Sequence, residues 1–385
     1  MAHHCSAFMA ATLSSDMDNT DTVKIFYDDA LENRLKLLSP DVNASQYRFV
    51  PVDRNTIRYG LGAVKGTGEQ AVNALIRARE ADGPFKDLFD FCLRVDKRMV
   101  NRRTIEALIR AGAFDSLDDH RARLMASVSI AMEAAEQAER NAMQASLFDV
   151  FDSSTQAEHG PQYCEVPRWS EAQKLAEEKL ALGFYFSGHP YHSFKAEVSR
   201  FVKKPLAALE PRKEPQLLAG LVVGVRTKIT TRGKMAFVLL DDGSSTLEVS
   251  VFNEIFEAER NKIRDDEVLI VEGKVQKDDF AGEGKIRVVA ERLLTLADAR
   301  GRFARQLHLS LNGQASGTNG RLAVQRLRTL LMPYMPGNCP VRLSYRNSEA
   351  SGELVFGESS RVRLEDELLS ALGEWLQHEN VSVEY

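Results

Sequence analysis

The hydrophobic period of the chain changes near residue 216, and this change limits the possible folds more than any other feature. From about residue 216 to 297, helical spacing gives way to five β-rich runs with turn signals between them. One short helix is expected over 253–263, between the third and fourth runs. Five short strands with a helix at that place are the order of an OB-fold barrel, which we predict over 215–298.

The remaining residues indicate a multidomain α+β protein. Residues 5–38 read as helical with a polar break at SSDMDNTD, and residues 47–59 read as a short hairpin. The predicted segments are a helical start (1–50), a tandem helix-hairpin-helix module (51–143), a polar linker (144–169), a helical connector (170–214), the barrel (215–298) and a small α+β domain (299–385).

A glycine-rich hairpin stands directly before an amphipathic helix expected over 69–81. Its residues are Val64, Lys65, Gly66, Thr67 and Gly68. Glycine permits positive φ and leaves space for an approaching phosphate, while amides at a helix N-terminus favour an anion. This is the chemistry of a helix-hairpin-helix motif, which grips the DNA backbone without reading bases. The alternative is an ordinary glycine-rich turn.

Charge supports the DNA-binding interpretation only locally. The net charge is −5, so the chain is not a globally basic nucleic-acid binder. Between Arg54 and Leu124, however, 14 Lys and Arg face 10 Asp and Glu. A dense basic group within this stretch is predicted to reach a second phosphate: Lys97, Arg98, Arg102 and Arg103. Each of them alone also fits a solvated surface charge.

Two large apolar residues occur at the start of the polar linker. Leu147 and Phe148 follow Gln144 in the sequence QASLF, where no core is obvious. Such a segment is typical of a peptide that docks into a partner's pocket, with Gln144 as a polar anchor. The alternative is that both residues pack back on their own helix.

The barrel offers its own nucleic-acid candidates. Arg232 and Lys234 lie in its first hairpin and Lys277 at the end of its fourth strand, where a single strand could contact them. We expect Phe237 and Phe252 to lie in the core rather than to act as stacking platforms. The β-rich runs are LLAGLVVGVRTKI, AFVLLDD, TLEVSVF, EVLIVEGKVQ and KIRVVAERLLTL.

The sequence lacks the usual signs of catalysis, metal binding and membrane insertion. No convergent carboxylates in a strand context suggest a Mg²⁺ site, and the four cysteines form no CxxC pair. No signal peptide and no apolar run of about 20 residues are present. We therefore expect no catalytic residues, no metal ligands, no cofactor and a cytoplasmic location.

Several long motifs together resemble the alpha subunit of bacterial DNA polymerase III. They are MAATLSSDMDNTD, YGLGAVKGTGEQAV, NRRTIEALIRAGAFD and LGFYFSGHP, followed by the barrel, and the resemblance covers essentially the whole chain. It implies that 1–50 ends the fingers region and that the hairpin module holds duplex DNA. It also implies that Gln144, Leu147 and Phe148 bind the β sliding clamp. The barrel would lie near the single-stranded template, and 299–385 would meet the tau subunit of the clamp loader.

The resemblance does not extend to the family's palm and N-terminal phosphoesterase-like domains. The catalytic aspartates and their Mg²⁺ belong to the parent polymerase, so we expect a fragment, a split gene product or an engineered C-terminal piece. The predicted function is binding: DNA, the clamp, tau and the remainder of the polymerase. One alternative is a chain counted as a nucleotidyltransferase by parentage. Another is a stand-alone OB protein that binds single-stranded DNA.

Overall fold

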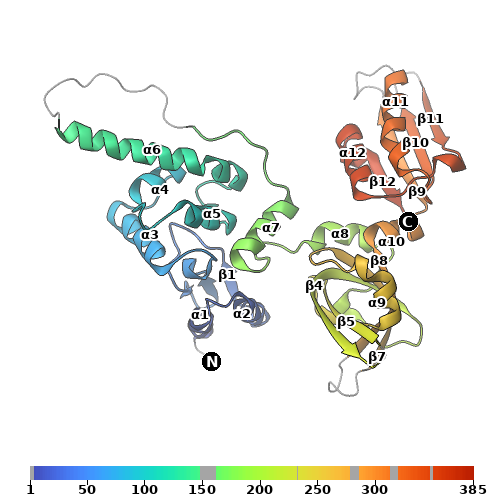
Figure 1. Cartoon of the computed structure of the whole chain (residues 1–385), viewed down its shortest axis with the longest axis horizontal. Helices are drawn as coiled ribbons and strands as arrows, with labels where there is room; N and C mark the ends of the chain where they lie inside the picture. The colour runs from blue at the N-terminus through green and yellow to red at the C-terminus, as the bar shows by residue number, and fades with distance from the viewer. Residues whose placement is uncertain (1–3, 148–161, 232, 278–285, 313–319, 347–349) are drawn as a thin grey trace. The chain divides into compact units, whose positions relative to one another are not determined.

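A computed structural model describes residues 4–147, 162–231, 233–277, 286–312, 320–346 and 350–385. The chain forms two compact units, residues 1–190 and 191–385 (Figure 1). The first unit is mainly helical with one small sheet, whereas the second contains a barrel and an α+β domain. The multidomain α+β prediction is confirmed.

The first unit has seven helices and three short strands among its described residues. The helices are α1 (Cys5–Ser15), α2 (Thr20–Glu32), α3 (Glu69–Asp82), α4 (Leu88–Arg94), α5 (Arg102–Arg110), α6 (Arg121–Leu147) and α7 (Glu171–Leu182). The strands are β1 (Lys36–Leu38), β2 (Val50–Pro51) and β3 (Thr56–Arg58), in the order β1-β3-β2. The predicted hairpin over 47–59 is confirmed, because β2 and β3 pair antiparallel.

The predicted helical stretch over 5–38 is wrong at its end. The polar break separates α1 from α2, where Asn19 accepts hydrogen bonds from the amides of Asp21 and Thr22 and so caps α2. Residues 36–38, however, form β1, which pairs parallel with β3. The apolar spacing of residues 36–38 also fits a helix, but these residues form a strand because they pair with residues 56–58, about 20 positions later.

The linker also begins later than predicted. Helix α6 continues through Gln144 to Leu147, so the backbone there is helical rather than a polar linker. Residues 121–147 are rich in Ala, Met and Glu, which favour continuation of a helix.

The predicted connector over 170–214 divides between the two units. Helix α7 belongs to the first unit, where Glu178 is buried and accepts hydrogen bonds from the amides of Phe186 and Ser187. Phe184 and Phe186 pack beside the ring of Tyr27 at centroid distances of 5.0 and 5.3 Å. Helix α8 (Tyr191–Val198) belongs to the second unit. Because these aromatic residues pack against Tyr27, the segment that follows α7 belongs to the first unit.

The barrel of the second unit has the predicted strand order. Its strands are β4 (Gln216–Thr230), β5 (Gly233–Asp241), β6 (Thr246–Val251), β7 (Val268–Lys277) and β8 (Ile286–Thr295), closed in the order β4-β5-β6-β8-β7. Helix α9 (Asn253–Glu259) lies between the third and fourth strands, as in an OB-fold. Alternate residues such as Val238, Leu240 and Val249 fill the barrel.

The last domain packs helices on a four-stranded sheet. Its elements are α10 (Leu296–Phe303), β9 (Gln306–Asn312), α11 (Gly320–Leu331), β10 (Val341–Arg346), β11 (Ser351–Val355), α12 (Asp366–Leu376) and β12 (Val381–Glu384). The sheet order is β11-β10-β9-β12, with β9 and β10 parallel and α11 between them in the chain. Strand β12 was not predicted, because four residues are too few to show alternation; it pairs antiparallel with β9.

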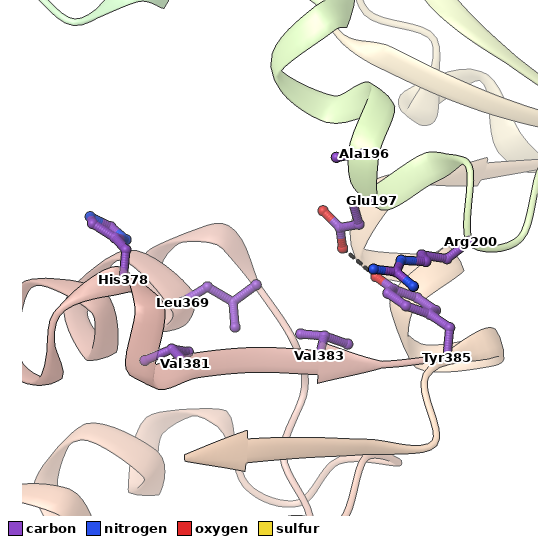
Figure 2. Close-up of a pocket in the computed structure, with 8 residues that line it drawn as sticks. All are labelled: Ala196, Glu197, Arg200, Leu369, His378, Val381, Val383 and Tyr385. Carbon is purple, nitrogen blue, oxygen red and sulfur yellow. Dashed lines mark hydrogen bonds between the residues drawn. The ribbon is translucent and has the colours of Figure 1, made fainter. Parts of the chain in front are cut away.

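A buried charged cluster ties this domain to α8. Arg300 of α10 is buried and donates to both carboxylate oxygens of Glu197, at 2.6 and 2.9 Å, and to Asp366 at 2.5 Å. The Tyr385 hydroxyl donates to the same Glu197 carboxylate. Figure 2 shows Glu197, Arg200 and Tyr385 together at one end of a pocket of about 330 Å³.

Candidate nucleic-acid interface

The glycine-rich hairpin has a buried side and an exposed side. Val64 and Thr67 are buried, and the Thr67 hydroxyl lies 2.6 Å from the carbonyl of Leu61 and 2.7 Å from that of Val64. Lys65, Gly66 and Gly68 are exposed. Of the five predicted residues, therefore, two hold the hairpin in shape and three face solvent.

Glycine is required at one of these positions and leaves open space at the other. Gly66 has φ +89°, a conformation that other residues rarely adopt, and Gly68 is the N-cap of α3. A Cβ on Gly68 would meet nothing within 4 Å. A phosphate oxygen can therefore approach the start of α3 without a steric barrier.

The amides of the hairpin are only partly available. The amide of Lys65 donates to Ala181 of α7 at 2.8 Å, and that of Thr67 donates to Val64 at 3.2 Å. Within the described residues, the amides of Gly66 and Gly68 have no acceptor. They point to an anion site smaller than a complete nest, extended by the free first-turn amides of α3.

A second helix N-terminus lies beside this hairpin. The side chain of Asn101 accepts from the amide of Thr104 and so caps α5. The Thr104 hydroxyl lies 3.4 Å from the Gly66 carbonyl, and a Cβ on Gly66 would lie 3.8 Å from Ala107. Two positive helix ends are thus brought to the same place, which increases the attraction for a phosphate.

Not every residue of the predicted basic group is free to contact a phosphate. Lys97 is 18% exposed, and its Nζ lies 2.9 Å from a Glu139 carboxylate oxygen, although the angle does not suit a hydrogen bond. This ion pair anchors the second hairpin, which is the loop between α4 and α5, to α6, so Lys97 is not free for a DNA contact. Arg102 donates to Glu106 at 2.7 Å.

Two members of the group remain free to reach a phosphate. Arg98 is 89% exposed and holds Asp96 only loosely, at 3.3 Å. Arg103 is exposed, and no described carboxylate lies within 4.0 Å of it. With Lys65, they give the two hairpins three cations available to DNA.

The predicted clamp-binding residues are not tested by the structure. Gln144 and Leu147 belong to helix α6, and Phe148 lies outside the described residues. Their role stays a prediction.

Two of the three barrel candidates, Lys234 and Lys277, lie toward opposite ends of β4. Arg232 lies outside the described residues. Lys234 is exposed opposite Ile229 near the end of β4, and its Nζ lies 5.7 Å from the centre of the Phe256 ring. Lys277 is exposed on β7, beyond the pair that Gly273 forms with Gln216 at the start of β4.

The expectation that two phenylalanines lie in the barrel core is wrong. Phe252 is 43% exposed, because it follows β6 and is the N-cap of α9. Phe237 alternates with the inward residue Val238, so its ring faces outward, half-buried. Its cross-strand partner Arg226 places its guanidinium 5.8 Å from the ring and forms an ion pair with Glu248.

Arg226 was missed from the sequence although a signal for it was present. Counting back from the turn pair Thr230 and Gly233 gives the register that sets Arg226 opposite Phe237. A groove of about 570 Å³ was also missed, because residues before the barrel contribute to it. Its basic members are Arg212, Lys213, Lys274 and Lys277.

Neither metal ligands nor membrane spans are found in the described ranges. No three His, Cys, Asp or Glu side chains there gather closely enough to hold a metal ion. No helix there is both long and apolar enough to cross a bilayer.

Three sequence families match successive parts of the chain. Residues 34–124 match the helix-hairpin-helix motif, and residues 217–296 match the OB-fold nucleic acid binding domain. Residues 326–376 match the C-terminal domain of DNA polymerase III subunit alpha. The first two coincide with the hairpins and the barrel seen in the structure.

Relatives described as DNA polymerase III subunit alpha match almost the whole chain. DNA polymerase III subunit alpha of Neisseria meningitidis serogroup A is 45% identical over 353 residues, 92% of this chain and 30% of the relative. The corresponding subunit of Escherichia coli K12 is 37% identical over 391 residues, 100% of this chain and 33% of the relative. This chain is homologous to a C-terminal portion of the DNA polymerase III alpha subunit. It spans about a third of the length of these curated relatives.

Two solved structures resemble this chain over about a quarter of its length. One is the second OB-fold domain of replication protein A from Methanococcus maripaludis. The match covers 24% of this chain and 93% of that domain, at 14% identity and TM-score 0.19. A single-stranded DNA binding protein from Thermus aquaticus covers 23% and 43%, at 26% identity and TM-score 0.19. The OB assignment here depends on strand order and on the sequence family rather than on these similarities.

Proposed function

We propose that this chain is the DNA-tethering part of a replicative DNA polymerase and works in the cytoplasm. The observation that carries the proposal is the pair of helix N-termini at Gly68 and Asn101, joined through Thr104 and Gly66. Homology to DNA polymerase III subunit alpha supports DNA replication as the setting. The bound ligand is duplex DNA, which the hairpins contact through its phosphates.

Binding through these hairpins is sequence-neutral and salt-dependent. Backbone amides and the cations of Lys65, Arg98 and Arg103 reach phosphates, which are the same in every sequence. Each phosphate that a cation neutralises releases counterions, so affinity falls as salt rises. Such contacts suit a protein that must stay on DNA while moving along it.

Protein partners complete the tether. We propose that Gln144, Leu147 and Phe148 dock into the β sliding clamp and that 299–385 meets the tau subunit of the clamp loader. Anchoring to a ring around DNA raises the local concentration of the hairpins at the duplex without new DNA contacts. The remainder of the polymerase would supply catalysis and its Mg²⁺.

A second candidate function is single-strand binding by the barrel. Exposed Phe252 and the outward pair of Phe237 with Arg226 favour it, because bases stack on such groups. Phe252→Ala should weaken binding of a labelled single strand by about 1–3 kcal/mol. Unchanged single-strand affinity in this variant would argue against a stacking role.

Duplex binding is tested by fluorescence anisotropy of a labelled duplex at several salt concentrations. We expect Lys65→Ala/Arg103→Ala to reduce the slope of log K against log salt by about 2, since each lost phosphate contact removes about one. The control Arg77→Ala/Lys86→Ala removes two exposed cations away from the hairpin tips. Equal slopes in both variants would contradict phosphate binding by the hairpins.

Clamp binding is tested by surface plasmon resonance with immobilised sliding clamp. Loss of binding in Leu147→Ala/Phe148→Ala, with duplex affinity retained, would support docking through this segment. Full binding by the double variant would assign the clamp contact elsewhere.

A further inference from the structure

The small sheet that precedes the hairpins has an apolar face and a basic face. Ile57 is buried and Leu37 packs against the same core. Because side chains alternate along a strand, Lys36 and Arg58 lie on the opposite face. Lys36 pairs with Thr56 in the parallel register, and Arg58, two residues further along β3, lies on the same face of the sheet.

Positive charge is concentrated around this sheet. Residues 34–58 contain two acidic residues, Asp41 and Asp53, against five basic ones: Arg34, Lys36, Arg48, Arg54 and Arg58. Arg58 is half-buried and the other four are exposed. Residues 1–33 contain Lys24 alone against six acidic residues, so the positive charge is confined to the sheet and its turns.

These five cations differ from most arginines of the first unit in lacking ion pairs. Among the described residues, no carboxylate lies within 4.0 Å of any of them. Eight other arginines of the first unit do have such a partner: Arg94, Arg98, Arg102, Arg110, Arg121, Arg123, Arg140 and Arg168. A cation without an ion pair is free to neutralise an external anion, and two of the five, Lys36 and Arg58, are carried on strands.

The segment around Arg48 contacts the residues that lead into the glycine-rich hairpin. The amide of Leu61 donates to Gln46 at 2.8 Å, and the amide of Gly62 donates to Tyr47 at 2.9 Å. A Cβ on Gly60 would lie 2.6 Å from the carbonyl carbon of Arg48. The segment that carries Arg48 is therefore packed against the residues that lead into the hairpin.

We propose that the outward face of β1, β3 and their turns is a second contact for the phosphate backbone of double-stranded DNA. It would hold the same duplex as the hairpins, a few phosphates away, and so lengthen the bound segment. This inference depends on the duplex binding proposed above. It assigns the sheet to the phosphodiester backbone and to no particular base sequence.

The test compares two double variants on a 30-base-pair duplex by anisotropy. Lys36→Gln/Arg54→Gln removes two exposed cations of the sheet, while Arg77→Gln/Lys86→Gln removes two exposed cations outside it. We expect the sheet variant to lower the salt slope by about 2 and to raise Kd about 30-fold in 0.15 M salt, from a slope of about 0.9 per contact. The control variant should match the parent chain.

Three other results would overturn the inference, and they can be told apart. Parent-like affinity and slope in the sheet variant, with Lys65→Ala/Arg103→Ala weakened, would remove the sheet and leave the hairpin function intact. No duplex binding by the parent chain would remove both. Weaker binding with an unchanged salt slope would mean indirect damage instead of a lost phosphate contact, and circular dichroism of the variant would show whether it is folded.

Discussion

Replacing Glu178 by Ala should loosen the support of the glycine-rich hairpin. Glu178 is 1% exposed and accepts three hydrogen bonds: from the amide of Phe186 at 3.0 Å, from that of Ser187 at 2.7 Å and from Arg121 at 3.4 Å. One turn further along α7, the carbonyl of Ala181 accepts the amide of Lys65. The carboxylate therefore fixes the helix on which the hairpin is anchored.

The size of the effect follows from what the variant leaves unpaired. Two amides whose hydrogen bonds to the carboxylate are partly buried lose their acceptor, at about 1–3 kcal/mol each, and buried Arg121 keeps Asp115 but loses one carboxylate. Removing one partner of a buried ion pair costs about 3–5 kcal/mol, and these costs overlap because one group makes all the contacts. We expect a total of about 3–5 kcal/mol in local stability.

Hydrogen exchange followed by NMR measures this loss of local stability at the affected amides. Exchange of Phe186 and Ser187 should accelerate by at least about a hundredfold, since about 1.4 kcal/mol corresponds to tenfold. The matched control is Glu177→Ala on the same helix, because Glu177 makes a more exposed ion pair with Arg110, worth at most about 1 kcal/mol. Similar exchange in the two variants would refute the argument.

Three further outcomes are expected from single features. Gly66→Ala should cost about 1–2 kcal/mol in a thermal melt because of its φ of +89°, whereas Gly68→Ala, at φ −81°, should cost little. Burial raises the pKa of Glu197, but hydrogen bonds from Arg300 and Tyr385 outweigh this and lower the pKa overall. Its contribution to stability should thus be present above the unfolded pKa of about 4.3 and be lost as pH falls through the lower folded pKa, in melts of the parent but not of Glu197→Gln. Burial also raises the pKa of Cys92 to about 12 and that of Cys339 to about 11, so iodoacetamide at pH 8 should label Cys5 and Cys164 first, as peptide mass spectrometry would show.

The sequence predicted the barrel because its signals are local. Each strand of an OB-fold shows its own alternation, and the order of strands and helix then leaves one closed topology. The same locality explains the correct placement of α3, whose N-cap is Gly68. Periodicity and capping residues can be recognised within a single segment, without knowing which other segments it contacts.

The errors share a different cause, which is contact between distant segments. Strand β1 exists because residues 36–38 pair with residues 56–58. Lys97 is tied up by Glu139 on α6, which no local pattern reveals. The outward positions of Phe237 and Phe252 depend on register and on the start of α9 rather than on hydrophobicity. Candidate contact residues are thus harder to predict than elements, since availability depends on every neighbour.

The LGFYFSGHP motif lies in the core that supports the glycine-rich hairpin. Phe184 and Leu182 are buried in the core that also holds Val64, and the preceding Ala181 accepts the amide of Lys65. The buried residues of the motif therefore support the hairpin from below. A hairpin free to tilt would have to be ordered at each encounter with a phosphate, at about 1–2 kcal/mol per residue. In a chain of net charge −5, with only a few available cations, that cost would cancel the two or three contacts on which the proposed tether depends.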